Sequence, residues 1–279
     1  MRSSRSFAAD SRTSEREAAC RPLPVPQDAA AARDVADAAG SLLLEIRAGL
    51  HEGAVPDAVR RDGDKRSSDL IVGSLRELYP ADAVLCEETA GLVGPREAER
   101  VWIVDPLDGT REFGEEGRSD WAVHVALVKD RELHAGAVAL PAQGVTLCSD
   151  DVPLRSSSRT RRRIRIVASR TRAVPEADAL AARLGGDVIR MGSAGAKVAA
   201  VVRGDADVYV HAGGLHVWDS AAPVAVANAF GLHTSRLDGS SLVYGPGVTW
   251  LPDLVVCRPD LREEVLAFLS AVPLATTGL

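Results

Sequence analysis

Two acids, a glycine and a hydroxyl stand close together in the middle of the chain, and these residue types suit phosphate chemistry. Asp105 and Asp108 are three positions apart, and Pro106 between them removes a backbone donor and fixes a turn. Gly109 lets the backbone approach a ligand closely, and Thr110 adds a hydroxyl beside the acids. Mg²⁺ prefers hard oxygen donors of this kind, so the run predicts a magnesium site that receives a phosphate.

The residues before the first acid indicate how it is positioned. Val101 to Val104 are β-branched or aromatic and predict a buried strand. We expect this strand to end at Asp105, because a buried carboxylate without a partner is very costly. The alternative is an ordinary turn whose acids cap a helix, since Asp and Gly are frequent in turns.

Acids at two other places strengthen the metal-site interpretation. Glu87 and Glu88 follow a short predicted strand at residues 83–86, and Asp219 directly precedes a predicted helix that begins near Ser220. Taken singly, the glutamates could form a surface turn and the aspartate could cap the helix. Carboxylates at several strand ends together form the oxygen cage that Mg²⁺ requires.

Strands and helices alternate in both halves of the chain, which predicts a layered α/β or α+β fold. The periodicity of apolar residues predicts helices at residues 28–50, 65–79, 175–184, 194–202 and 220–229. We expect a polar loop at residues 56–63, and Asp238-Gly239 is typical of a hairpin turn.

The division of the chain follows from changes in composition. Residues 1–27, rich in Ser, Arg and Pro, are expected to form a disordered tail. An N-terminal half at residues 28–154 would carry most of the acids, and a C-terminal half at 164–279 would add Asp219 and substrate contacts. Residues 155–165 carry six arginines, interpreted as a solvated linker rather than a nucleic-acid patch because no aromatic residues lie among them.

Composition excludes several classes of protein. Of the 279 residues, 46% are hydrophobic and 26% charged, which is typical of a globular protein. The net charge of −6 argues against a nucleic-acid polymer as partner, and no apolar run of about 20 residues predicts a membrane span. No segment of signal-peptide type is present, so a cytoplasmic location is expected. The four cysteines contain no Cys-x-x-Cys pair and should be free thiols rather than zinc ligands.

The chain resembles the inositol monophosphatase superfamily of Mg²⁺-dependent, lithium-sensitive phosphatases over about residues 30–260. Three motifs occur in the same order: Glu87-Glu88, then Asp-Pro-Leu-Asp-Gly-Thr at residues 105–110, then Trp-Asp-Ser-Ala-Ala-Pro at residues 218–223. The resemblance implies a layered α-β-α-β-α sandwich of the inositol monophosphatase and fructose-1,6-bisphosphatase type. It also implies hydrolysis of a small phosphate monoester with two or three Mg²⁺ ions, by a monomer or a homodimer.

The resemblance assigns a role to each motif residue. The metal ligands would be Glu87, Asp105, the carbonyl of Leu107, Asp108 and Asp219, with Asp105 bridging two ions. Thr110 would orient a metal-bound water, and an acid near the second helix would activate it. Substrate contacts would come from Asp108, Gly109, Thr110, Arg111, Ser193, Lys197 and His211.

The water-activating acid departs from the family pattern. The family places it at the end of a Val-Thr-x-x-Asp segment, whereas this chain has Arg-Arg-Asp-Gly-Asp at residues 60–64. Asp64 is preferred over Asp62 and Asp69 because it lies 23 residues before Glu87, a distance typical of the nucleotidase branch. A helix cap or a solvated loop acid is the alternative for Asp64.

The choice of branch rests on a few positions. Arg111-Glu112-Phe113 and Lys197 resemble the 3′(2′),5′-bisphosphate nucleotidases of sulfate assimilation, which implies removal of the 3′-phosphate of 3′-phosphoadenosine 5′-phosphate to give AMP. A lysine there would hold a second phosphate, although it could equally be a helix lysine that reaches to the surface. His211 stands where nucleotidases usually have arginine, and Gly-Ser-Ala at residues 192–194 is closer to the inositol branch.

Two alternatives therefore stay open. The first is a sibling phosphatase acting on inositol 1-phosphate, fructose 1,6-bisphosphate or a biosynthetic nucleotide monophosphate. The second is a regulatory homologue that keeps the metal fold but has lost activity, and the missing Val-Thr pair is its only support.

Overall fold

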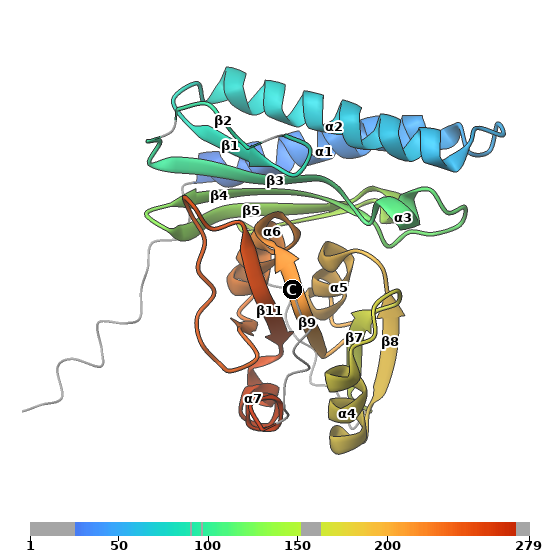
Figure 1. Ribbon diagram of the computed structural model, residues 1–279, viewed down its shortest axis with the longest axis vertical. Helices are drawn as coiled ribbons and strands as arrows, with labels where there is room; N and C mark the ends of the chain where they lie inside the picture. The colour runs from blue at the N-terminus through green and yellow to red at the C-terminus, as the bar shows by residue number, and fades with distance from the viewer. Residues whose placement is uncertain (1–25, 90, 96, 152–162, 272–279) are drawn as a thin grey trace, which may run out of the picture.

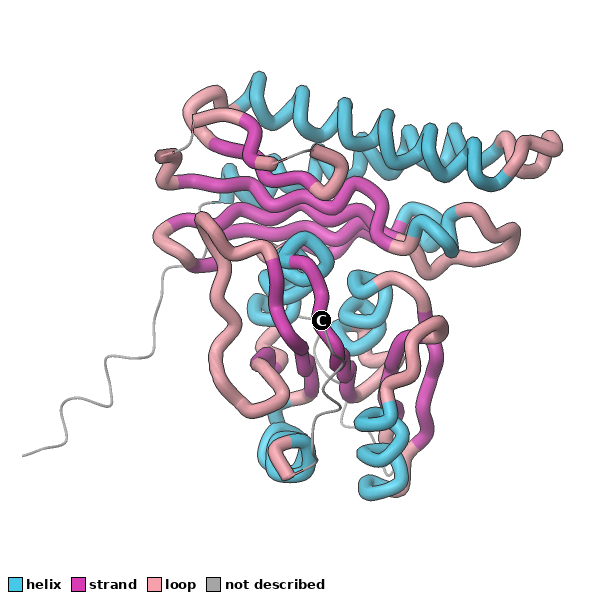
Figure 2. The backbone as a smooth tube through the Cα atoms, in the orientation of Figure 1, coloured by secondary structure: helices cyan, strands magenta, loops and turns pink. Residues whose placement is uncertain are grey.

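The computed structural model describes residues 26–271 except residues 90, 96 and 152–162. Its helices and strands alternate in five layers (Figure 1), and Figure 2 shows the two sheets one above the other with helices outside and between them. The α-β-α-β-α sandwich expected from the sequence is confirmed. Residues 1–25 of the predicted tail and most of the arginine-rich segment lie outside the described residues, whereas Pro26 and Gln27, expected to belong to the tail, begin the first helix.

The first sheet holds six strands in the order β2-β1-β3-β4-β5-β6. Their bounds are β1 (Ala83–Cys86), β2 (Leu92–Val93), β3 (Arg100–Asp108), β4 (Ala122–Lys129), β5 (Glu132–Leu140) and β6 (Val145–Cys148). Only β1 and β3 pair in parallel within this sheet. Helices α1 (Pro26–Ala48) and α2 (Pro56–Leu78) cover its outer face, where their apolar residues share a core with the buried Trp102.

The second sheet holds five strands in the order β10-β11-β9-β7-β8. Their bounds are β7 (Arg165–Ser169), β8 (Asp187–Met191), β9 (Val208–His216), β10 (His233–Ser235) and β11 (Trp250–Cys257). Helices α4 (Pro175–Leu184) and α7 (Arg262–Leu269) pack on its outer face. Helices α5 (Ala194–Val202) and α6 (Val217–Ala229) lie between the sheets, where small and β-branched residues allow close packing.

Helix α2 corrects one expectation from the sequence. Residues 56–63 were expected to form a loop, but they are the first turns of α2. Pro56 suits the first helical position, because its missing N–H would have no helical partner there. Gly63 faces the core, and a Cβ on it would meet the ring of Phe113 at 2.8 Å. The glycine therefore reflects close packing rather than a loop, and Asp64 lies inside the helix.

Strand β3 is longer than expected. It does not end at Asp105 but continues to Asp108. Asp105 pairs with His124 of β4 and Asp108 pairs with Ala122, so three steps on β3 face two on β4. An extra residue of this kind forms a bulge, which bends a strand and redirects its side chains. The bulge, with Pro106 at a position that needs no ladder donor, replaces the expected turn.

The end of the chain shows a second difference. The turn at Asp238-Gly239 forms, with the Asp238 carboxylate accepting from the Ser240 amide at 2.8 Å. However, it does not join two adjacent strand ends, because residues 236–249 separate β10 from β11. Strands β2, β6, β10 and β11 and helix α7 were not expected, since their segments are short or carry no clear periodicity.

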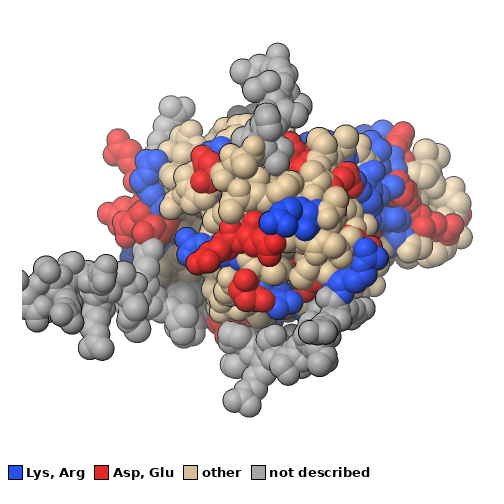
Figure 3. Space-filling view, turned by 90° about the horizontal axis from the view of Figure 1, so that it is seen from below, with Lys and Arg blue, Asp and Glu red and all other residues tan. Residues whose placement is uncertain are grey.

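The surface and the cysteines agree with the compositional analysis. Figure 3 shows acidic and basic side chains interspersed at the end of the molecule that carries α4 and α7. None of the helices described here has the length and apolarity needed to cross a bilayer. Cys86, Cys148 and Cys257 are buried free thiols, and burial raises the pKa of Cys148 to about 11 and of Cys257 to about 12.

Candidate metal and phosphate site

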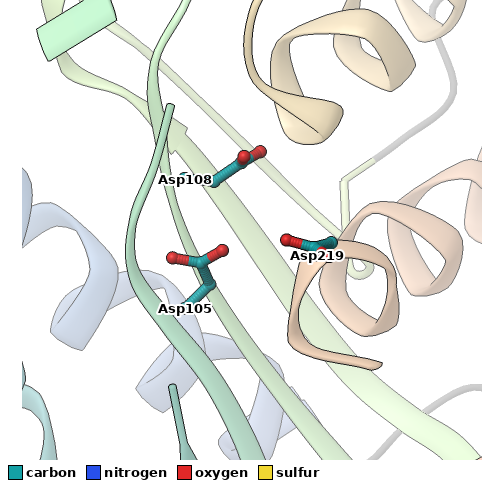
Figure 4. Close-up of side chains that lie close together, drawn as sticks. All are labelled: Asp105, Asp108 and Asp219. Carbon is teal, nitrogen blue, oxygen red and sulfur yellow. The ribbon is translucent and has the colours of Figure 1, made fainter. Parts of the chain in front are cut away.

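Three carboxylates from two distant parts of the chain meet between the sheets. Asp105 and Asp108 come from the bulged end of β3, and Asp219 comes from the first turn of α6, as Figure 4 shows. Each offers one oxygen atom, and these oxygens all lie within 4.8 Å of one another. Such a set of hard oxygen donors could hold a divalent cation.

Asp105 is the most buried member, at 1% exposure. Its Oδ1 accepts the Leu107 amide at 3.0 Å. Burial, followed by the charges of Glu87 and Asp108, holds the pKa of Asp105 well above its ordinary range. Among the residues that the structure describes, the strongest influences on Asp105 include no cation, and a bound metal ion would favour its charged form.

Asp108 is fixed by the segment that begins α5. Its Oδ2 accepts the Ser193 hydroxyl at 2.5 Å and the Gly195 amide at 2.8 Å. In the described part of the chain no donor reaches the other oxygen, Oδ1. One oxygen of Asp108 is thus held by the protein, and the other is left for a ligand.

Asp219 occupies the third position of α6 and accepts the His216 amide at 2.8 Å. This is half of a capping box, so the helix-capping alternative describes part of its environment. Burial and the charge of Asp108 nevertheless raise the pKa of Asp219 to about 7. Lys197 lowers it, but not enough to restore the ordinary value.

Glu87 lies at the end of β1, beside β3. As a whole residue it is exposed, yet its carboxyl group approaches Asp105. Desolvation of this group, together with the charges of Asp108 and Glu88, raises the pKa of Glu87 to about 7. Glu88 is exposed. The structure therefore brings Glu87 to the edge of the three aspartates.

Asp64 and Thr110 contact each other beside the cluster. The Thr110 hydroxyl lies 3.0 Å from the Leu107 carbonyl oxygen and 3.3 Å from Asp64 Oδ1. Burial and the charge of Glu88 raise the pKa of Asp64 to about 6. Asp62 and Asp69 instead form exposed ion pairs with Arg66 and Lys65. Of the three acids considered, Asp64 alone lies at the candidate site.

Gly109 starts the four-residue helix α3 (Thr110–Phe113) with φ 88°, in the left-handed region. A Cβ there would lie 3.2 Å from the Asp120 carbonyl oxygen and from the Ser193 Cβ, so only glycine fits well. Arg111 is exposed on α3. The structure places Gly109 against the candidate site but leaves the Arg111 side chain on the surface.

The lysine of α5 is buried. Lys197 is 4% exposed, its Nζ donates to the Gly192 carbonyl oxygen, and it lies 5.4 Å from the centre of the Tyr209 ring. Burial lowers the pKa of Lys197 to about 8, while the charges of Asp108 and Glu112 oppose this effect. Lys197 is thus a cation enclosed behind the acidic cluster, not a surface lysine.

His211 lies on β9 with both ring nitrogens in contact. Its Nδ1 is 3.0 Å from the Tyr209 hydroxyl, and its Nε2 is 2.8 Å from the Gly214 carbonyl oxygen. Burial lowers the pKa of His211 to about 4, so the ring is neutral. The Arg172 guanidinium lies 3.0 Å from the same Nε2 and 2.9 Å from the Gly214 oxygen.

Arg172 was missed in the sequence. It follows the carboxyl end of β7, which pairs in parallel with β9, so the two strands bring Arg172 and His211 to one edge. A basic residue just after a predicted strand of a parallel pair was the available signal.

Comparison with known proteins identifies the family of the chain. A family model described as "Inositol monophosphatase family" matches residues 27–272. The chain belongs to the inositol monophosphatase family. Enzymes of this family are metal-dependent phosphatases, and the cluster of aspartates could bind a metal. The expectation of a phosphatase that acts on a small-molecule phosphate is thereby confirmed.

Several relatives cover most of the chain. It is 44% identical over 256 residues to a Mycobacterium leprae protein named 3′-phosphoadenosine 5′-phosphate phosphatase, covering 88% of this chain and 94% of the relative. It is 40% identical over 239 residues to the Mycobacterium tuberculosis protein of the same name, covering 83% and 89%. An Escherichia coli protein named 3′(2′),5′-bisphosphate nucleotidase CysQ is 30% identical over 198 residues, covering 67% and 80%.

Solved structures support the fold. Inositol monophosphatase II from Staphylococcus aureus superposes with a TM-score of 0.68 at 22% identity, covering 84% of this chain and 90% of that one. The extragenic suppressor protein SuhB from Bartonella henselae gives a TM-score of 0.70 at 21% identity, covering 86% and 98%. At these identities the likeness concerns the fold alone.

Proposed function

We propose that this phosphatase removes the 3′-phosphate from 3′-phosphoadenosine 5′-phosphate or its sulfated analogue. Water is consumed, and AMP or its analogue and inorganic phosphate are released. The observation that carries the proposal is the 44% and 40% identity, over 88% and 83% of the chain, to mycobacterial proteins of that name. The Arg111-Glu112-Phe113 continuation and Lys197 agree with it.

The proposed cation ligands are Glu87, Asp105, the Leu107 carbonyl, Asp108 and Asp219, for two or three Mg²⁺ ions. The raised pKa values of Glu87, Asp105 and Asp219 support this assignment, because they arise from burial and, after it, from the charges of the neighbouring carboxylates. When bound, Mg²⁺ would neutralise the phosphate and lower the pKa of the attacking water. Low millimolar Li⁺ should inhibit turnover at limiting Mg²⁺, and unchanged turnover would contradict the assignment.

Thr110 and Asp64 are proposed to handle the proton of the attacking water. The Thr110 hydroxyl has one hydrogen, which can serve either the Leu107 carbonyl or Asp64 Oδ1. With the hydrogen on the side of Asp64, a lone pair of Thr110 can accept from the water and the Leu107 carbonyl is free for a cation. Asp64, with its pKa raised to about 6, is ionised at neutral pH and can take up the proton at Oδ1.

A second phosphate needs cations on the far side of the site. We propose that Lys197 and Arg172 supply them, with Ser193, Gly109 and the neutral His211 as polar contacts. The place of Arg172 supports this role, because its guanidinium lies against His211, where nucleotidases usually have arginine. Arginine suits the task, since its fixed fork of donors matches phosphate oxygens. Arg111, exposed on α3, would contact the substrate only from the surface.

Two broader features belong to the same proposal. The family resemblance extends to homodimers, and sedimentation at micromolar concentration would measure whether this chain forms one. Three buried cysteines stay as free thiols, which favours a reducing compartment such as the cytoplasm.

A sibling substrate is the second candidate. Gly-Ser-Ala at residues 192–194 is closer to the inositol branch, and His211 is neutral where nucleotidases carry a cation. Both features would suit a substrate with a single phosphate. The panel below separates the two candidates.

The deciding experiment compares kcat/KM with Mg²⁺ for four substrates: 3′-phosphoadenosine 5′-phosphate, inositol 1-phosphate, fructose 1,6-bisphosphate and 5′-AMP. A preference of at least about tenfold for the first, or about 1.4 kcal/mol in transition-state binding, is the expected result. A flat profile, or preference for a monophosphate, would contradict the proposed substrate. Absence of turnover on all four would indicate a homologue without activity on these substrates.

A further inference from the structure

One fully buried histidine lies beside the candidate metal site and has no role in the preceding scheme. His124 is on β4 and is 0% exposed. It pairs directly with Asp105 of β3, so both side chains leave the sheet on the same face. That face is the one covered by α5 and α6.

The imidazole of His124 reaches two parts of the site at once. Its Nδ1 lies 3.1 Å from the carbonyl oxygen of Trp218, the residue before Asp219 in the first turn of α6. Its Nε2 lies 3.3 Å from Asp108 Oδ2. Among the described residues, Nε2 has no hydrogen bond of good geometry, although it is enclosed. A buried polar atom of this kind is uncommon and calls for an explanation.

The first turn of α5 closes around the same ring. A Cβ on Gly195 would collide with His124 Nε2, so the imidazole fills the space that a side chain at residue 195 would need. The Gly195 amide and the Ser193 hydroxyl both donate to Asp108 Oδ2. Three protein groups thus surround one oxygen of Asp108, and they leave Oδ1 toward Asp105 and Asp219.

We propose that His124 is a positioning residue that sets the distance between Asp108 and Asp219. Its Nδ1 contacts the Trp218 carbonyl in the first turn of α6, which carries Asp219, and its Nε2 lies against the Asp108 carboxylate, so the imidazole joins the two segments that carry these acids. Without the two nitrogens, α6 loses this contact with β4 and Asp108 keeps only the Ser193 and Gly195 donors, so the donor oxygens of Asp108 and Asp219 shift apart. The inference rests on the proposed metal role of these two acids, and outer contacts of metal ligands typically change metal affinity by about 10- to 100-fold.

The test compares variants of His124 with a control on the same strand. His124→Leu keeps the volume and removes both nitrogens, whereas His124→Gln keeps a polar nitrogen that can reach Asp108. Val125→Ala is the control, because Val125 is equally buried but faces the α1 and α2 side. Mg²⁺ binding is measured by calorimetry on the full chain without substrate, and the melting temperature is measured in parallel.

We expect His124→Leu to weaken Mg²⁺ binding at least tenfold and His124→Gln to recover most of the loss. Val125→Ala should lower the melting temperature, because buried methyl groups are lost, and leave Mg²⁺ affinity unchanged. If His124→Leu binds Mg²⁺ as tightly as the wild type, the proposal is overturned and the metal site stands. If the wild type itself binds no Mg²⁺, both this proposal and the metal assignment fail.

A second pair of variants serves if His124→Leu does not fold. Gly195→Ala should weaken Mg²⁺ binding because the new methyl group displaces the ring. In a His124→Ser background the same change should cost little, since the smaller side chain leaves room for it. Strictly additive losses in the double variant would show that the ring and Gly195 are not coupled, and would overturn the positioning role.

Discussion

The first sheet and the second half of the chain bring different charges to the site between the sheets. The β1 and β3 ends of the first sheet present Glu87, Asp105 and Asp108, and burial together with mutual repulsion raises the pKa of Glu87 and Asp105. The second half adds one acid, Asp219, and the cation Lys197, whose pKa burial lowers. In the first sheet the carboxylates are held toward their neutral form, and in the second half the same holds for Lys197. The charge of each side favours the charged form of the other.

This contrast indicates a division of labour. Carboxylates crowded at one place are suited to hold cations, whereas Lys197 and Arg172 are suited to hold the phosphates of a substrate. Variants of the carboxylates should then affect turnover itself, and variants of Lys197 and Arg172 should affect which substrate is preferred. The predictions below test this division, from the largest expected effect to the smallest.

The largest effect is expected at Asp105. Asp105→Asn keeps the shape but removes the charge that would bridge two cations, so kcat/KM should fall by at least about 10³-fold. The metal-free variant should also be more stable than the wild type, because one of several repelling buried carboxylates is gone. Turnover and thermal unfolding with EDTA measure the two effects. The control is Asp62→Asn, which removes a charge from an exposed ion pair with Arg66. Near-wild-type turnover of Asp105→Asn would refute the metal assignment.

A smaller loss is expected at Asp64. Asp64→Asn keeps a hydrogen-bond partner for Thr110 but cannot accept a proton, so kcat should fall by about 10²- to 10³-fold. In the wild type, activity should rise with pH through the pKa of Asp64, which is about 6 without metal and lower beside bound cations. The pH profile of kcat measures this. A variant profile that keeps the same acidic limb would assign the limb to another group.

A change of about tenfold is expected at the two cations of the second half, Lys197 and Arg172. Lys197→Met keeps most of the buried stem, and Arg172→Ala removes a guanidinium from the surface near His211. Each should raise KM for 3′-phosphoadenosine 5′-phosphate about tenfold, and change KM for 5′-AMP less, because a single phosphate occupies the metal side. Equal effects on both substrates would remove these residues from the second-phosphate role.

The smallest effect concerns stability against pH. The pKa values of Glu87 and Asp219, about 7 in the metal-free fold, lie above those of the same acids in the unfolded chain, near 4. The folded state therefore binds more protons, and stability should fall as pH rises from about 4 to about 7, then level off. Saturating Mg²⁺ should flatten this slope. Melting temperatures from pH 5 to 8, with EDTA and with Mg²⁺, measure it, and a rise of the EDTA curve with pH would contradict the raised values.

The sequence predicted the first sheet's contribution better than the second's. Asp105 to Thr110 are contiguous, so their spacing alone indicates a shared site, and Glu87 stands at an obvious strand end. Lys197 and His211 were located only by resemblance, since single residues on separate elements carry no spacing. Arg172 was not found because its meaning depends on the parallel pairing of β7 with β9, which no local pattern reveals.

Local patterns failed where packing between elements decided the structure. Gly63 looked like a loop residue, but it is a close contact between α2 and Phe113. The β3 strand continued past Asp105 because a bulge, rather than a turn, brings Asp108 round. No sequence pattern marks His124 as part of the site, because a histidine within an apolar strand has the same flanking residues whether or not it has a functional role.

The three buried thiols are internal probes of how often each sheet opens. Cys86 and Cys148 lie in the first sheet and Cys257 in the second, and each is too enclosed and too weakly acidic to react in place. A thiol reagent can modify them only when the surrounding strands open. In a Cys20→Ser variant, the labelling rate of each cysteine therefore reports the opening of its own sheet, and similar or different rates distinguish two sheets that open together from two that open separately.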